Sequence, residues 1–430
     1  MNSKVRVVLP DSYDLVVGDT FQLFYRGVVE APNPYCYSIV ATCEKGKNFP
    51  RYFEFTPKEV GEYLLDISVY DAEQNLLGGA KTLLKVVEPK APKKPVNVLV
   101  LGDSLTCHGD WVSEVSRRIK SKDGEPKGLG FDGINFVGNC KNGDVGFEAF
   151  GGWYWVSFMS GKSNAIWVEA PNKLVVGDQH AVWKDIDGNL WQLETLQVDY
   201  LKFKRYGDNT AEKPAGDTLY PFKNNVTQTP IKFYSSSSES VSPFFDNESK
   251  EIDVKKYLER SNIDGIDAVY VLLGVNGIMR TIAFTLSWKE YCKVVVKEAK
   301  ELIAKLREVN PNLKVKILSP VLPSCKGGMG WNYGAEPPFN DYYDIVDYIM
   351  ELCIAYKDWC NEPDSKEYME YVNLTGQFDS ENAYPSIQKP VNVRSTKTEE
   401  FEVNGFHPTS IGQMQIADAV FRNVVKEFCS

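Results

Sequence analysis

A chain of 430 residues is longer than one ordinary domain, so the sequence predicts two or three domains. Hydrophobic residues make up 43% and charged residues 25%, which are globular values, and the net charge of −10 excludes a generally basic surface for nucleic acid or anionic lipid. The sequence contains no run of about 18 apolar residues that would span a membrane. We therefore expect neither nucleic acid nor a membrane as a partner.

Nine cysteines are scattered along the chain without any Cys-x-x-Cys pair, and only three histidines accompany them. This pattern argues against a zinc site, and an odd, dispersed set favours free thiols over a disulfide framework. The first residues, Met1–Val5, lack the long apolar run of a signal peptide. We therefore expect a cytoplasmic protein if the chain is complete, and a secreted or periplasmic one if a leader precedes it.

Residues 1–90 are predicted to form a smaller all-β domain. Short apolar or alternating runs, separated by turn residues, recur there with the spacing of strands in an immunoglobulin-like (Ig-like) β-sandwich. The runs are Val5–Leu9, Phe21–Val29, Tyr37–Thr42, Arg51–Phe55, Tyr63–Tyr70 and Lys81–Val87. This domain is expected to act as a spacer or lid, with sugar binding as the alternative. A linker rich in proline and lysine, residues 91–95, is expected to end it.

Residues 96–430 are predicted to form an α/β domain, because buried-strand patterns alternate with helical ones and imply a parallel sheet. Strands are expected at Val96–Leu101, Ile134–Val137, Ala268–Leu273 and Leu313–Leu318, and helices at Trp111–Lys120, Trp288–Val309, Tyr342–Tyr356 and Ser410–Phe428. The alternation breaks at about 160–250, which predicts a β-rich insertion of hairpins and long loops. Within this insertion, strands are expected at Lys173–Val176, Ala181–Lys184, Leu190–Leu193 and Tyr200–Phe203, and a loop at Ser235–Ser238.

The strongest chemical signal is Gly102-Asp103-Ser104, which follows the first expected strand of the α/β domain. Ligands of open α/β sheets bind beyond the carboxyl ends of the strands, so Ser104 is expected at that edge. Gly102 allows a tight turn there. Because a serine hydroxyl needs a base to take its proton, Ser104 is a candidate nucleophile only if an imidazole reaches it.

Three histidines compete for the role of base. His108 follows Ser104 by four residues and His180 lies in the insertion, so both are expected to be incidental. His407 lies just before the last expected helix, in a loop that Pro408 stiffens. A rigid loop presenting an imidazole suits a general base, so His407 is the preferred candidate.

Four segments in this order resemble the named blocks of the SGNH (GDSL) hydrolases: Gly102–Leu105, Phe150–Trp153, Gly274–Asn276 and Asn404–Pro408. The resemblance covers about residues 96–430 and implies a three-layer, flavodoxin-like fold that needs no metal or other cofactor. It also implies a serine esterase that works by two-step acyl transfer, with Ser104 as nucleophile and His407 as base. The oxyanion hole would consist of the backbone N–H groups of Ser104 and Gly152 and the side-chain amide of Asn276.

Two positions depart from the family's pattern. Asn404 stands where the family usually has aspartate, and Gly277 where it often has aspartate. An amide can accept a hydrogen bond from the imidazole but cannot stabilise the imidazolium as a carboxylate does. Asn404 is therefore expected to orient His407 as a neutral member of the catalytic set, with a backbone carbonyl or another carboxylate such as Glu402 as alternatives.

The expected substrate is an acylated carbohydrate. Family members with an additional β-domain and a Gly-Gly-Trp block resemble carbohydrate esterases that remove O-acetyl groups. Trp153 and Trp331 are expected to stack on sugar rings, with core packing as the alternative. A lipase or thioesterase acting on small or lipid-like acyl esters, and a catalytically weak glycan-binding protein on the same scaffold, are the two alternative functions.

Overall fold

The computed structural model describes residues 5–160, 165–169, 178, 181–196, 200–209, 211, 213–233, 235–238, 241–280, 283, 285–334 and 341–430. The chain divides into two compact units. The first combines Met1–Val156 with Val254–Ser430, and the second is Ser157–Asp253. The second unit coincides with the stretch for which the sequence predicts an insertion.

The centre of the first unit is a sheet with the strand order β12-β13-β10-β23-β24-β25, in which β11 also pairs with β10. The strands are β10 (Val96–Gly102), β11 (Ile134–Val137), β12 (Cys140–Asn142), β13 (Val145–Ala149), β23 (Ala268–Leu272), β24 (Lys314–Leu318) and β25 (Met369–Val372). Every neighbouring pair except β12–β13 is parallel. With β11 and β13 taken as the second strand, the order is 2-1-3-4-5, as in flavodoxin-like sheets.

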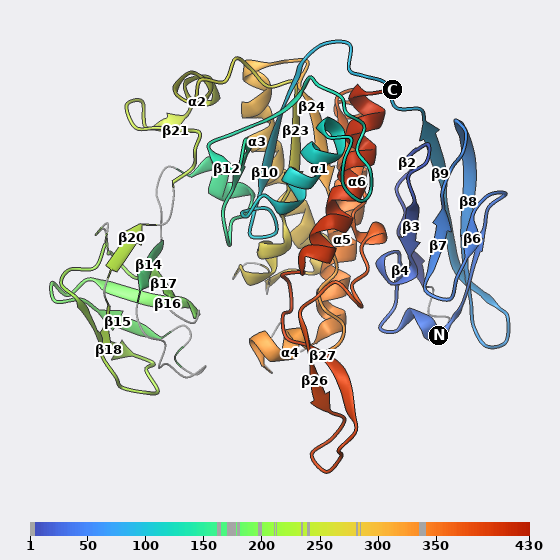
Figure 1. Ribbon diagram of the computed structural model, residues 1–430. Helices are drawn as coiled ribbons and strands as arrows, with labels where there is room; N and C mark the ends of the chain where they lie inside the picture. The colour runs from blue at the N-terminus through green and yellow to red at the C-terminus, as the bar shows by residue number, and fades with distance from the viewer. Residues whose placement is uncertain are drawn as a thin grey trace. The chain divides into compact units, whose positions relative to one another are not determined.

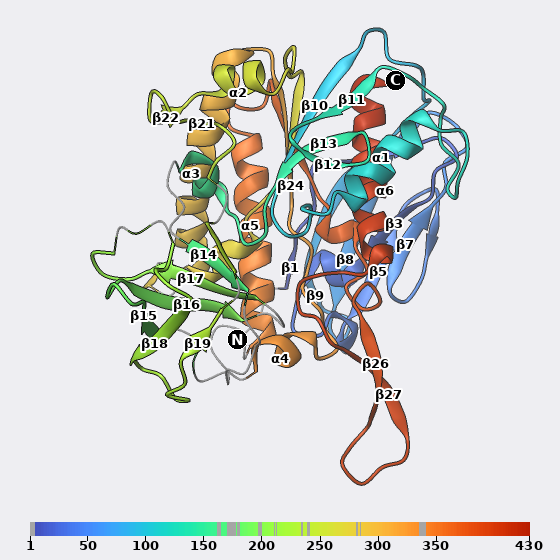
Figure 2. The same cartoon turned by 60° about the vertical axis from the view of Figure 1, so that its left-hand side comes forward.

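Helices cover both faces of this sheet (Figure 2). On one face α1 packs against α6, and on the other α3 packs against α5. Their bounds are α1 (Asp110–Lys120), α3 (Trp288–Val309), α5 (Tyr342–Cys360) and α6 (Ser410–Phe428), and two shorter helices are α2 (Val254–Arg260) and α4 (Gly328–Tyr333). A capping box begins α3, because Ser287 and Glu290 each accept the other's backbone N–H. The bounds predicted from apolar periodicity agree with α3 and α6 and fall four residues short in α5.

The N-terminal β-module (residues 5–87) consists mainly of two sheets, with orders β2-β9-β8-β5 and β3-β7-β6. Its strands are β1 (Arg6–Val7), β2 (Ser12–Val16), β3 (Phe21–Phe24), β4 (Val29–Glu30), β5 (Ser38–Thr42), β6 (Lys47–Asn48), β7 (Tyr52–Phe55), β8 (Gly61–Tyr70) and β9 (Leu76–Val87). The strand expected at Phe21–Val29 is wrong in part, because a 3₁₀ turn at Tyr25–Gly27 divides it. Residues from both sheets share one apolar core.

Ion pairs join the N-terminal β-module to the helices of the first unit. Asp19 of the module accepts from Arg118 on α1 and Arg422 on α6 at 2.6 and 2.7 Å. Both arginine side chains are at most 4% exposed. Since a buried charge without a partner is costly, these pairs fix how the module docks on the helices.

The second unit, residues 157–253, contains a sheet with the order β19-β18-β15-β16-β17-β14-β20. The bounds are β14 (Ala165–Glu169), β15 (Val182–Lys184), β16 (Leu190–Leu196), β17 (Tyr200–Arg205), β18 (Thr218–Lys223), β19 (Ile231–Lys232) and β20 (Ser235–Ser238). The loop expected at Ser235–Ser238 is wrong, because these residues pair with β14. The strand expected at Lys173–Val176 lies outside the described residues. The core includes Trp183 and Trp191.

A long antiparallel hairpin, β26 (Ser386–Pro390) and β27 (Thr398–Glu402), projects from the first unit before the last loop and α6 (Figure 1). The sequence pattern does not predict this hairpin. Its five paired residues on each strand are mostly exposed. An exposed strand pair carries no buried face, so the apolar alternation that identifies a strand is absent.

Candidate active site

Ser104 lies on a tight turn directly after β10, at the carboxyl edge of the central sheet. The N–H groups of Thr106 and Cys107 donate to the carbonyl of Asp103 and close this turn. A side chain at Gly102 would bring Cβ to 2.3 Å from Oγ1 of Thr106, so the turn requires glycine there. The neighbouring strand β23 ends at the same edge, which makes this the switch point of the sheet, where ligands of such folds bind.

His407 reaches the serine from the loop that precedes α6. Its Nε2 lies 2.9 Å from Oγ of Ser104, although 303 residues separate them in the chain. Gln413, in the first turn of α6, donates to the carbonyl of Leu105 at 3.2 Å and ties the two segments together. The structure thus brings together the two residues that the sequence analysis selected, at a distance suited to proton transfer.

Asn404 contacts the backbone and not the imidazole that it is predicted to orient. Its Oδ1 accepts the N–H of Phe406 at 3.1 Å and the N–H of His407 at 2.8 Å. The amide therefore shapes the loop as a local turn. Within the described part of the chain, Nδ1 of His407 has no hydrogen-bond partner. Glu402 does not reach the ring either, because it accepts from Ser324 and from the backbone of Lys326.

The surroundings of His407 favour its neutral form. Loss of water around the ring, followed by the charge of nearby His108, lowers the pKa of His407 below its ordinary value of 6.5. His108 itself is exposed, and His180 lies outside the described residues. An imidazole that is neutral at pH 7 is in the form that accepts a proton from serine.

The pH profile is expected to report this lowered pKa. Because activity appears as His407 loses its proton, the acid limb of kcat/KM should have its midpoint below 6.5. In Asn404→Asp the carboxylate adds negative charge beside the imidazole and should move the limb upward by about half a unit to one unit. The matched control is Asn392→Asp, in a similar turn at the tip of the β26–β27 hairpin. A limb that moves equally in both variants, or in neither, would contradict this assignment.

Asn276, the third predicted oxyanion donor, connects the nucleophile turn to the Gly151-Gly152 loop. Its Nδ2 donates to Oδ2 of Asp103 at 3.2 Å and to the carbonyl of Trp153 at 3.0 Å. Asp103 is fully buried, and desolvation raises its pKa to about 7 despite the N–H that Leu105 donates to it. Both hydrogens of the Asn276 amide thus have acceptors.

The loop that contains Gly152 follows β13 directly. The N–H of Trp153 donates to the carbonyl of Phe150 at 3.2 Å, and Gly152 has a φ of +77°. This backbone angle favours glycine. The prediction that Trp153 stacks on a sugar is wrong, because its side chain is 3% exposed and packs on Phe150 with ring centroids 4.1 Å apart.

Trp331, the second predicted aromatic contact, is 52% exposed on α4. The next residue, Asn332, accepts the N–H of Gly405 at 2.6 Å, two positions before His407. The ring of Phe401 on β27 lies 6.1 Å from the Trp331 ring. An exposed tryptophan therefore lies on a helix that is hydrogen-bonded to the His407 loop.

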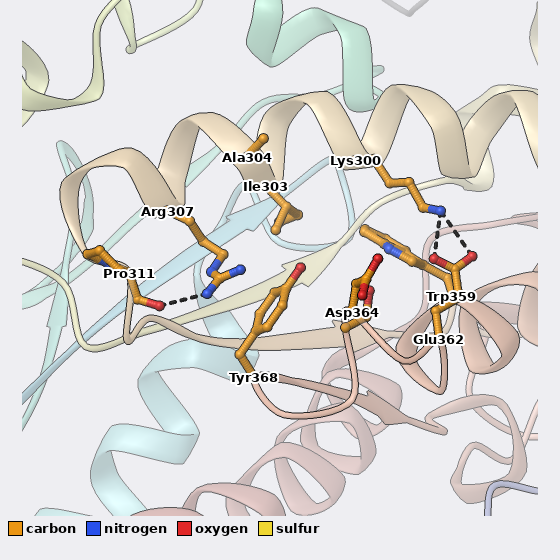
Figure 3. Close-up of a pocket in the computed structure, with 10 residues that line it drawn as sticks. Lys300, Ile303, Ala304, Arg307, Pro311, Trp359, Glu362, Asp364 and Tyr368 are labelled. Atoms are coloured by element: carbon orange, nitrogen blue, oxygen red, sulfur yellow. Dashed lines mark hydrogen bonds and ion pairs between the residues drawn. The ribbon is translucent and has the colours of Figure 1, made fainter.

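A separate groove of about 570 Å³ lies between α3 and the turn before β25 (Figure 3). Arg307 stacks over the Tyr368 ring at 3.5 Å and donates to the carbonyl of Pro311, while Lys300 pairs with Glu362. Pro311 and Tyr368 precede β24 and β25, so the groove lies at the amino edge of the sheet. It is therefore not part of the Ser104 site.

Among the residues that the structure describes, we find neither a metal site nor a membrane-spanning helix. These residues contain no group of three or more His, Cys, Asp or Glu side chains that is arranged to hold a metal ion. Across the same residues, none of the helices is long and apolar enough to cross a membrane.

No protein-family model and no curated protein matches the chain. Among solved structures, it is similar to a carbohydrate esterase family 3 protein from Talaromyces cellulolyticus, with 12% identity over 77% of this chain and 97% of that one and a TM-score of 0.35. It is also similar to Est24, a carbohydrate acetylesterase from Sinorhizobium meliloti, with 12% identity over 77% of this chain and 100% of that one and a TM-score of 0.33. Similarities this distant carry no argument about the function of this chain.

Proposed function

We propose that this protein is a serine ester hydrolase in which Ser104 is the nucleophile and His407 the general base. The observation that carries the proposal is the 2.9 Å contact between Oγ and Nε2 at the switch point of the sheet. The Oγ proton passes to His407 as Oγ attacks the acyl carbon. The imidazolium then gives that proton to the departing alcohol, and water, activated by the same base, releases the acyl group from Ser104.

The proposed oxyanion hole is formed by the N–H groups of Ser104 and Gly152 and the amide of Asn276. Charge develops on the acyl oxygen in the tetrahedral intermediate, and donors aimed at that oxygen lower the barrier. Because Trp153 now accepts one Asn276 hydrogen, the oxyanion must replace that carbonyl as acceptor. We therefore expect the loop of Gly152 and Trp153 to shift when an ester binds.

The proposed substrate is an acetyl ester of a carbohydrate. Trp331 supports this choice, because its exposed ring lies on a helix bonded to the His407 loop and offers an aromatic face to a sugar. The Nζ of Lys389 lies 5.9 Å from the centroid of that ring.

The two sheets of the N-terminal β-module, with β2 parallel to β9, support its assignment to the Ig-like class.

The acyl preference tests this function. With a series of p-nitrophenyl esters, kcat/KM is expected to be highest for acetate and to fall with chain length. An acetylated glycan such as acetylated xylan should release acetate in the same preparation. Faster turnover of longer chains would overturn the acetylesterase assignment in favour of a lipase or thioesterase, and glycan binding without any turnover would leave the binding-protein alternative.

The Trp331 contact is tested in the same assays. Trp331→Ala should raise KM for acetylated xylan by about fivefold, because stacking on one ring contributes on the order of 1 kcal/mol. It should leave p-nitrophenyl acetate turnover unchanged. Phe49→Ala, an exposed aromatic of the N-terminal β-module, is the matched control. Equal effects of both variants would remove Trp331 from the proposed substrate site.

A further inference from the structure

One short segment, residues 378–385, is hydrogen-bonded to both ends of the His407 loop; we call it the brace. The carbonyl of Pro385 accepts the N–H of Val403 at 2.8 Å. The carbonyl of Ala383 accepts both the N–H and the hydroxyl of Thr409, at 2.7 and 3.0 Å. The loop between Val403 and Thr409 is thus anchored to the brace at its start and at its end.

The brace is held on its other side by two arginines of the N-terminal β-module. Arg26 donates to Glu381 at 2.9 Å, and Arg51 donates to both Glu381 and Asp379. Asp379 also binds within the brace, accepting from the backbone of Glu381 and the side chain of Asn382. The module therefore contacts the brace through a shared network and not through one isolated pair.

The charged side chains of this network are largely shielded from water, which strengthens the hold of the arginines on the brace. The side chains of Glu381 and Asp379 are each 13% exposed, and that of Arg26 is 14% exposed. Although burial raises the pKa of Glu381, the hydrogen bond from Arg26 and the charge of Arg51 hold it below its ordinary value. Exposed single ion pairs contribute little, whereas partly buried networks with several donors constrain geometry.

His407 depends on the placement of its loop. Within the described residues its Nδ1 has no partner that would fix the ring, and Asn404 acts only on the backbone. A displacement of about 1 Å at a reacting group can cost about 10²-fold in rate. The position of the loop, and hence of the brace, therefore decides whether Nε2 stays within reach of Ser104.

We propose that Arg26 and Arg51 are positioning residues for His407, so that the N-terminal β-module contributes to catalysis by holding the His407 loop in place. This inference rests on the proposed function of Ser104 and His407. It replaces the expectation that the module is a spacer or lid. The arginines touch neither the substrate nor the reacting atoms, and they act through Glu381, the brace and the loop.

The test compares the double variant Arg26→Ala/Arg51→Ala with Arg6→Ala. Arg6 belongs to the same module and also binds partly buried carboxylates, Glu30 and Glu351, but Glu351 lies on α5 and not on the brace. The double variant should lower kcat for p-nitrophenyl acetate at least tenfold with little change in KM. Arg6→Ala should keep wild-type kcat even where its melting temperature falls as much. Arg51→Lys should restore part of the activity of Arg51→Ala.

A second readout does not depend on catalysis. The chain has three histidines, so the ring proton signals are assignable with His108→Gln and His180→Gln. The pKa of His407 should lie below 6.5 in the wild type and move upward in the double variant, because the ring on a released loop leaves the surroundings, His108 included, that lower its pKa. It should not move in Arg6→Ala.

Unchanged kcat and an unchanged His407 titration in the folded double variant would overturn the inference. An equal loss of kcat in Arg6→Ala would overturn it too, because a general loss of stability would then explain the result. If the double variant does not fold, the single variants are compared in the same way. A wild-type protein without Ser104-dependent hydrolysis would instead contradict the proposed function, and the titration would still test the brace.

Discussion

Ser104→Ala and His407→Ala are each expected to reduce kcat for p-nitrophenyl acetate by about 10⁴- to 10⁶-fold. The 2.9 Å contact makes the two side chains one reacting unit, in which the hydroxyl attacks and the imidazole takes its proton. Loss of either side chain leaves only substrate binding and the donors of the proposed oxyanion hole. Turnover by purified enzyme, with folding checked by circular dichroism, measures the effect.

The double variant Ser104→Ala/His407→Ala should be no slower than either single variant, because groups that act as a unit are not additive. His108→Ala is the matched control. His108 is exposed and close enough for its charge to lower the pKa of His407, but it has no hydrogen bond to Ser104. It should retain wild-type kcat. Wild-type turnover in Ser104→Ala would contradict every enzymatic function considered above.

Much of the central fold follows from local sequence. The strands β10 and β23 are continuous apolar runs, and the structure buries almost every residue in them. Strand β25, Met369–Val372, was not predicted because Glu370 interrupts the apolar pattern. That carboxylate accepts hydrogen bonds from Lys316 and Lys426. These ion pairs form only in the folded chain, so the sequence pattern does not reveal them.

In the candidate site, too, some features could be predicted from local sequence and others depend on contacts made in the folded chain. Ser104 and His407 could be predicted because each lies in a short motif beside a strand end or a helix start. The partner of the Asn404 amide could not, because the same side chain can reach either the ring or the backbone. The burial of Trp153 depends on its packing against Phe150, and the brace depends on contacts between residues more than 300 positions apart.

Asn276→Ala is expected to lower kcat by about 10²- to 10³-fold while KM for p-nitrophenyl acetate changes little. The amide is the side-chain donor of the proposed oxyanion hole, and the removal of one such donor has an effect of this size. It is already beside the nucleophile, bonded to Asp103 at 3.2 Å. Because the donor acts on charge that appears only in the transition state, the loss belongs in kcat.

The control for Asn276→Ala is Asn423→Ala, which removes another buried amide. Asn423 accepts from Tyr270 at 2.9 Å and donates to Asp14 at 2.7 Å, and neither partner belongs to the site. This variant should lose stability but keep kcat, since its polar partners are buried away from Ser104. If both variants lost kcat equally, general destabilisation would explain the effect. If Asn276→Ala kept wild-type kcat, the acyl oxygen would not be bound by this amide, because the loss of a donor to the oxyanion slows the step that the donor stabilises.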